Sequence, residues 1–201
     1  MKKKNNVKRL VGLALLAAIV AVLQLLSLII KFGPFSITLA LIPLVVGAII
    51  YGPKGGFILG FVMGLIVLLT NSEAFFVVNP LATVLICLVK SSVAGFLSGL
   101  FFKLLKNKNE RLAVVIASLT APLVNTGLFA IGVLIFFMPT LREWAEGSNA
   151  IGYLFLTIIG INFIIEFVIN SILSSTVYYI ENTVTKRFNL GNENNELEEV
   201  E

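Results

Sequence analysis

Several polar side chains interrupt otherwise apolar stretches of this 201-residue chain, and these are the residues that could do chemistry. Lys90 follows the run Leu85-Ile86-Cys87-Leu88-Val89, and Asn162 and Glu166 stand four residues apart among Ile, Phe and Val. Asn125 lies in a third apolar stretch. Burying an amide, and above all a charge, is costly unless the group is paired, so each of these side chains needs a partner or a ligand.

Lys90 has two interpretations, and the sequence leaves both open. Its ammonium could face a cavity and hold an anionic or strongly polar ligand. Alternatively, it could reach toward an interface or pair with Glu166 inside the protein. Its position, about ten residues into an apolar segment, makes it difficult for the side chain to reach an interface.

The second polar group forms a stripe. Asn162, Glu166 and Asn170 are spaced by four, which puts them on one face of a helix. The stripe could form hydrogen bonds to other helices, with Glu166 neutralised by Lys90, or it could form the wall of a cavity; the two roles are compatible. Asn125 follows Pro122, which frees a backbone carbonyl, so it could bond that carbonyl or a ligand.

Missing residue types exclude several classes of function. The chain has no histidine, and its single cysteine, Cys87, lies in an apolar run. Catalysis by a Ser-His-Asp or Cys-His set, a histidine metal site and a cysteine zinc site are therefore excluded. We expect no enzyme, no cofactor and no metal. The G-x-x-x-x-G-K-[ST] sequence is also absent, so another chain must bind ATP if uptake is ATP-driven.

Composition identifies the environment that must position these residues. Hydrophobic residues make up 58% of the chain and charged residues 13%, about half the charged share of a soluble domain. Mean hydropathy is +0.99. We therefore predict an all-α, multi-pass protein of the cell membrane. Six apolar segments are expected, at about residues 10–30, 36–51, 54–70, 80–105, 112–138 and 151–180.

The predicted organisation has three parts: a basic N-terminus at 1–9, a six-helix transmembrane domain at 10–185 and a polar tail at 186–201. The first apolar run is too long for a cleaved signal peptide, and residues 191–201 are expected to be disordered. With six helices, twelve basic residues fall on one side and only Lys31 and Arg142 on the other. Basic residues favour the cytoplasm, so both termini are predicted to be cytoplasmic.

Small residues predict close helix contacts. Ala14, Ala17, Ala18 and Ala21 form overlapping A-x-x-x-A pairs, and Gly56, Gly60 and Gly64 form a glycine ridge. Gly95 and Gly99 repeat the spacing in residues 80–105. The connections at 71–79 and 138–147 mix aromatic and polar residues, which suits a lid over a pocket or an aromatic belt at the membrane surface. For Phe75 and Phe76 both roles stay open.

The order of these features resembles the substrate-binding S components of energy-coupling factor (ECF) vitamin transporters. The segment from Ser36 to Gly56 carries an Ile-Pro pair near the start of one helix and a G-P-x-x-G turn into the next, as that family does. The alanine-rich first helix and the six helices in about 200 residues also match. The resemblance covers about residues 10–185.

The resemblance implies a high-affinity vitamin binder that works with a transmembrane coupling subunit and two ABC ATPases, and it implies no role for nucleic acid. It implies ligand contact by Lys90, Asn125, Asn162 and Glu166, with Asn79 and Trp144 in a lid. It implies docking on the coupling subunit through Ala14, Ala17, Ala18 and Ala21.

For the substrate, Phe35 to Leu39 and Asn79-Pro80-Leu81 look closest to the pantothenate-type branch. That branch often has arginine in the region of Lys90, so the lysine is a departure, although either cation suits a carboxylate. The alternatives are riboflavin, folate, or a pyridoxine or pyrimidine precursor. A stand-alone six-helix carrier, a membrane enzyme and a purely structural subunit are rivals from other classes. A carrier would be expected to show an internal repeat, and none is evident.

Overall fold

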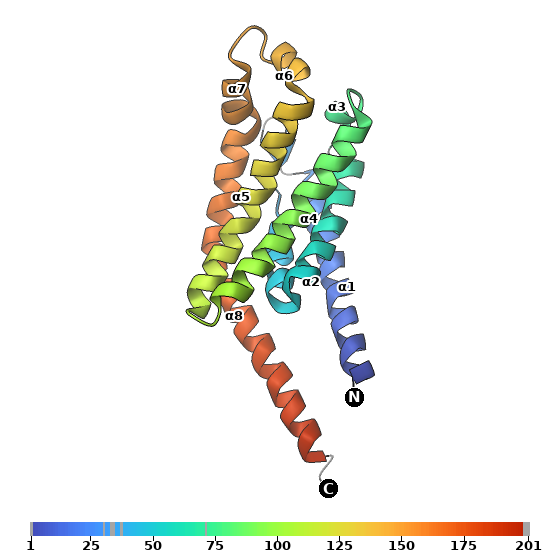
Figure 1. Cartoon of the computed structure of the whole chain (residues 1–201), viewed down its shortest axis with the longest axis vertical. Coiled ribbons are helices and arrows are strands. Elements are labelled where there is room, and N and C mark those ends of the chain that lie inside the picture. Colours follow the sequence, from blue (N-terminus) through green and yellow to red (C-terminus); the bar gives the residue numbers. More distant parts are fainter. Residues whose placement is uncertain (1, 30, 33–34, 37, 71, 199–201) are drawn as a thin grey trace.

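The computed structural model describes the backbone of residues 2–29, 31–32, 35–36, 38–70 and 72–198, and this part of the chain is a bundle of long helices (Figure 1). Within these ranges, five helices are long and apolar enough to cross a membrane. The all-α membrane fold is confirmed. The elements in chain order are α1 (Lys2–Leu26), β1 (Lys31–Phe32), β2 (Phe35–Ser36), α2 (Leu41–Thr70), α3 (Glu73–Phe76), α4 (Pro80–Leu105), α5 (Glu110–Phe136), α6 (Met138–Trp144), α7 (Ala150–Tyr153), the π-helix η1 (Leu154–Gly160) and α8 (Ile161–Glu198).

Helix α2 contains the second and third predicted segments, joined by a break at Gly52. This glycine has φ 77° and ψ −173°, a backbone conformation that residues with a Cβ rarely adopt. Pro53 follows and starts the next helical limb, because proline needs no hydrogen-bond donor there. The first limb, residues 41–51, is about 16 Å long at about 1.5 Å per residue, which is shorter than a bilayer core. Six membrane crossings therefore remain a prediction.

The glycine ridge of α2 packs directly on α4. A Cβ at Gly64 would lie 2.6 Å from the carbonyl oxygen of Cys87, and one at Gly60 would overlap the carbonyl of Ser91. Gly56 faces Gly95 in the same way. Two helix backbones approach this closely only where at least one of them lacks a side chain at the contact, so the ridge predicted from the sequence is an internal packing seam.

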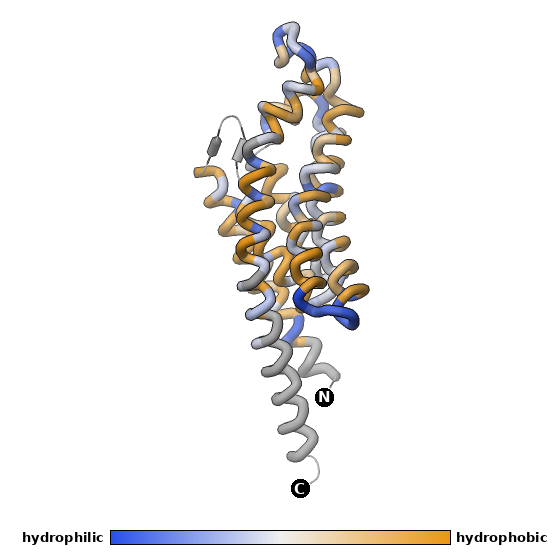
Figure 2. Tube along the Cα trace, turned by 90° about the vertical axis from the view of Figure 1, so that its left-hand side faces the viewer, coloured by the Kyte–Doolittle hydropathy of each residue, from blue (hydrophilic) through white to orange (hydrophobic). Residues whose placement is uncertain are grey.

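Many large apolar side chains point outward, including Leu15 on α1, Leu104 on α4 and Ile135 on α5. Figure 2 shows apolar residues along the helices and hydrophilic residues where α4 joins α5 and where α6 joins α7. Apolar outer faces between polar ends are what a bilayer requires.

A short β-ribbon that was not predicted from the sequence precedes α2. Strands β1 and β2 are antiparallel, with Lys31 opposite Ser36 and Phe32 opposite Phe35. The next residues return to α1, where the Leu39 backbone N–H donates to the Ser27 Oγ at 3.2 Å. Thr38 and Leu39, which follow the ribbon, therefore lie against the interior side of α1.

Different elements lie at the two ends of the bundle. The start of α1, the α4–α5 connection and the end of α8 lie at one end, and α3, α6 and α7 lie at the other (Figure 1). This agrees with the alternation expected from the basic residues, but which end is cytoplasmic remains a prediction.

The C-terminal segment differs from expectation. Helix α8 continues to Glu198, a helical backbone where the sequence predicted a disordered tail from Gly191; the polar tail itself stays a prediction. Extending an existing helix costs far less than nucleating one, which lets α8 run on through Asn and Glu residues. Met1, Asn71 and residues 199–201, which belong to the predicted N-terminus, the 71–79 connection and the tail, lie outside the described residues.

Candidate ligand-binding site

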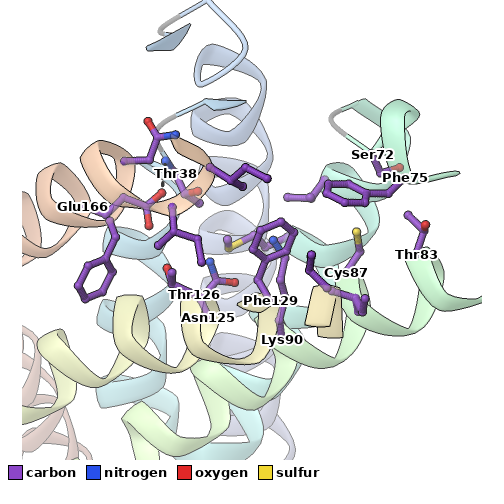
Figure 3. Close-up of a pocket in the computed structure, with 18 of the residues that line it drawn as sticks. Thr38, Ser72, Phe75, Thr83, Cys87, Lys90, Asn125, Thr126, Phe129 and Glu166 are labelled. Atoms are coloured by element: carbon purple, nitrogen blue, oxygen red, sulfur yellow. Dashed lines mark hydrogen bonds between the residues drawn. The ribbon is translucent and has the colours of Figure 1, made fainter. Parts of the chain in front are cut away.

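A cavity of about 860 Å³, measured to its open mouth, lies among α1, α2, α4, α5 and the η1–α8 segment (Figure 3). This volume counts the open solvent at the mouth as well as the enclosed space. Met63, Val67, Ile86, Val133 and Ile158 provide apolar walls. A small set of polar side chains interrupts these walls.

Four of the predicted site residues line this one cavity. Lys90 comes from α4, Asn125 from α5, and Asn162 and Glu166 from α8. Lys90 and Asn125 are 35 positions apart in the chain and Glu166 is further still, so the helix packing is what gathers them. Contact with a ligand remains a proposal for all four.

Lys90 is half-buried, and its ammonium lies over an aromatic ring. Its Nζ is 4.9 Å from the centroid of Phe129, within the range of a cation–π contact. Among the described residues, Lys90 and Glu166 form no ion pair, although the two charges attract each other across the cavity. Next to Lys90 in the chain, the Ser91 Oγ donates to the Asn125 Oδ1 at 3.4 Å. The ammonium therefore faces the cavity, and no carboxylate among the described residues forms an ion pair with it.

Glu166 is buried, with 5% of its surface exposed. Its Oε1 accepts a hydrogen bond from the backbone N–H of Thr38 at 2.7 Å, joining α8 to the segment before α2 (Figure 3). Figure 3 shows Glu166 and Thr38 on one side of the cavity, Phe75 and Thr83 on the other, and Lys90 between them. Glu166 therefore marks one end of the site.

The residues of the predicted polar stripe have two different roles. The side chain of Asn170 donates through Nδ2 to the backbone oxygen of Glu166 at 2.8 Å, and Asn170 does not line the cavity. Asn162 does line it, together with Ile158 and Ile159 of η1. A π-helical turn displaces side chains from the ordinary helical register and often occurs at functional sites. Here it ends at Gly160, two residues before Asn162.

The two predicted lid residues are not part of the cavity wall. The Asn79 Oδ1 caps α4 by accepting from the backbone N–H of Ala82 at 3.1 Å. The ring of Trp144, at the end of α6, packs 5.3 Å from that of Phe75. Phe75 is buried and lines the cavity, whereas Phe76 is exposed. Of the two aromatic residues whose roles were open, Phe75 thus belongs to the pocket and Phe76 to the outer surface.

Sequence reasoning missed most of the lining residues, Gln24, Thr38 and Phe129 among them. Gln24 carried a signal, since it is the only glutamine of the chain and stands within the first apolar run. Thr38 lines the site because of the β-ribbon, and Phe129 is one of sixteen phenylalanines, so neither could be singled out by type.

Taken together, the cavity offers one ammonium, one carboxylate and several amide and hydroxyl groups within apolar walls. Such a set can hold a small polar anion in a fixed orientation. Comparison with known proteins agrees with a binding role. Residues 8–178 match the family described as "ECF transporter, substrate-specific component". The chain belongs to this family. It is therefore a transporter component and not an enzyme, and it is a multi-pass integral membrane protein.

This S component also has a curated relative with a named substrate. It is 28% identical over 193 residues to the "Pantothenic acid transporter PanT" of Lactococcus lactis subsp. cremoris (strain MG1363). The match covers 87% of this chain and 94% of the relative. Together, the family and the relative support a vitamin S-component role, with an ECF module as the partner that membership of the family implies.

Proposed function

We propose that this S component binds pantothenate on the outer side of the membrane and delivers it to an ATP-driven ECF module. The observation that carries the proposal is the Lys90 ammonium, which lines the cavity without an ion pair among the described residues. The similarity to a relative named for pantothenic acid points to the same ligand.

Pantothenate suits the cavity chemically. It is a small, flexible molecule with a carboxylate at one end, an amide in the middle and two hydroxyls at the other end. A carboxylate beside Lys90 would complete a charge-assisted hydrogen bond. The apolar walls from α2 and α5 would cover the carbon chain, and water would be excluded from the charged pair.

Partners would have to bind the ATP that drives uptake, because this sequence has no G-x-x-x-x-G-K-[ST] motif. The partners we propose are a transmembrane coupling subunit and two ABC ATPases. The alanine face of α1 is the proposed docking surface: Ala14 and Ala18 are exposed, and Ala17 and Ala21 are half-buried. A strip of small side chains lets a second helix approach closely.

Topology is part of the same proposal. The two limbs of α2 with α1, α4, α5 and the η1–α8 segment would make six membrane segments with both termini in the cytoplasm. The end that holds α3, α6 and α7 would then face outward.

Uptake into liposomes tests this function. Labelled pantothenate should accumulate when the chain is reconstituted with a coupling subunit and ATPases and ATP is supplied, and it should not accumulate with the chain alone. Accumulation against a gradient by the chain alone would identify a stand-alone carrier. Accumulation of another vitamin in place of pantothenate would keep the S-component role and replace the substrate.

Lys90→Met tests the site in a separate binding assay. The substitution removes the charge and keeps the length of the side chain. We expect pantothenate affinity to fall at least about 30-fold, the usual loss when one partner of a buried charged pair is removed. Unchanged affinity would assign Lys90 a structural role.

A further inference from the structure

Two carboxamides that line the cavity leave their oxygen atoms without a partner. The Oε1 of Gln24 and the Oδ1 of Asn162 are buried and accept no hydrogen bond from the part of the chain that the structure describes. Gln24 is 1% exposed and Asn162 is 9% exposed. Both residues contribute to the cavity wall. The hydroxyls of Ser92, Ser98 and Ser118 are also buried without a partner among the described residues, but these serines do not line the cavity. The position of the two amides on the cavity wall is therefore what points to a bound ligand as the missing partner.

The spacing along their helices places both residues near Glu166. Asn162 is one helical turn before Glu166 on the same face of α8. Gln24 is three residues before Ser27, whose Oγ accepts from the Leu39 N–H. The neighbouring Thr38 N–H donates to Glu166. Gln24 is therefore on the face of α1 that meets the segment held by Glu166.

This end of the site is rich in acceptors. The carboxylate of Glu166 accepts one bond from Thr38, and the carboxamide oxygens of Gln24 and Asn162 are unsatisfied. In contrast, the ammonium of Lys90 is a donor and lies toward the middle of the cavity, over Phe129. Acceptors bind hydroxyl or N–H groups and repel a carboxylate, whereas an ammonium attracts one.

We infer that Gln24 and Asn162 are specificity residues that accept hydrogen bonds from donor groups at one end of the ligand, while Lys90 binds its anionic end. This inference rests on the proposed ligand-binding function. It adds which chemical groups the ligand carries and how the ligand is oriented in the cavity. The preferred ligand is a small anion whose far end carries hydroxyl or N–H groups, with that end against α1 and α8. In pantothenate, the hydroxyl end would meet Gln24 and Asn162.

If Gln24 and Asn162 have these roles, Gln24→Met and Asn162→Leu should affect stability and ligand affinity differently. Each variant replaces an amide whose oxygen is unpaired with an apolar side chain of similar size. The ligand-free protein should therefore be as stable as wild type or more stable. Ligand affinity should fall, because the hydroxyls of the ligand lose a buried acceptor. A residue that only supports the fold would give the opposite result for stability.

Calorimetric titration of the purified full-length chain, with three probes, tests the inference. The probes are pantothenate, pantothenol, in which a hydroxymethyl group replaces the carboxylate, and a pantothenate analogue without hydroxyls. Gln24→Met should weaken pantothenate and pantothenol binding about ten-fold, the effect of one lost hydrogen bond with its partner left buried. It should change binding of the dehydroxylated analogue less than about three-fold, because that probe has no hydroxyl to lose. Asn162→Leu should behave in the same way.

Asn170→Leu is the matched control, since Asn170 is a buried amide of α8 that does not line the cavity. It should leave the affinity for all three probes unchanged. Thermal unfolding of each ligand-free variant checks the fold. Unchanged pantothenate affinity in both Gln24→Met and Asn162→Leu would overturn the inference, and so would equal losses for pantothenate and the dehydroxylated analogue. Failure of the wild-type chain to bind pantothenate would overturn the proposed substrate and this inference with it.

Discussion

Gly64→Ala should loosen the contact between α2 and α4 while leaving the ligand chemistry intact. The new Cβ would be 2.6 Å from the Cys87 carbonyl oxygen and 3.1 Å from the Leu88 Cα. Ordinary contacts begin near 3.4 Å, so the two helices must separate by about 0.8 Å at this point. Both nearest atoms are backbone, so no side-chain rotation can relieve the overlap.

The magnitude follows from two opposing effects. Overpacking of a close-packed interior costs about 1–3 kcal/mol. Replacing glycine by alanine inside a helix returns up to about 1 kcal/mol. We expect a net loss of about 1–2 kcal/mol in the free energy of unfolding, which corresponds to roughly 2–8 °C in the unfolding midpoint for a chain of this size. Ligand affinity should change less than about three-fold, because the flexible stem of Lys90 can follow a small movement of α4.

Gly127→Ala supplies the matched control. Gly127 is on α5 beside Thr126, and an added Cβ there meets nothing within 4 Å. The same substitution should therefore leave stability unchanged or raise it by up to about 1 kcal/mol. Thermal unfolding of the purified variants in detergent measures both effects. If Gly64→Ala is as stable as Gly127→Ala, the glycine ridge is not a tight packing seam and the reasoning is wrong.

Three further predictions address the charges, the docking face and the cap of α4. Lys90→Met and Glu166→Gln should have near-additive effects on the unfolding of the ligand-free protein, within about 0.5 kcal/mol, because the two groups form no ion pair; a rescued double variant in thermal unfolding would indicate an internal pair. Ala18→Leu should abolish uptake in liposomes with the ECF module and leave ligand binding intact, and normal uptake would exclude docking there. Asn79→Ala should cost about 1 kcal/mol of stability through the lost N-cap, without altering pantothenate affinity; a large loss of affinity would instead support a lid role.

The fold was largely predictable because membrane helices have a strong sequence signal. The segment predicted at 80–105 agrees with α4, and the break at Gly52-Pro53 follows from the backbone preferences of glycine and proline. The β-ribbon could not be predicted, since strands of two residues carry no periodic pattern. The helical extension of α8 was missed because a polar composition does not distinguish a disordered tail from a helix that continues an existing one.

The candidate site was predictable where a polar side chain conflicts with an apolar environment. Lys90, Asn125, Asn162 and Glu166 stood out for that reason, and the helix packing brings them to one cavity. Gln24 obeys the same rule and could have been identified. Thr38 could not, because its position depends on a hydrogen bond to Glu166, 128 residues away. Asn79 was expected in a lid, and a residue directly before Pro80 is also where an N-cap belongs.

Mass spectrometry of retained small molecules tests the central claim most directly. The purified chain would be incubated with an equimolar mixture of pantothenate, riboflavin, folate and pyridoxine, freed of unbound vitamin and denatured. The account predicts release of pantothenate at close to one molecule per chain, and loss of that signal in Lys90→Met. Release of a different vitamin from the wild-type chain, or of none while the chain remains folded, would contradict it.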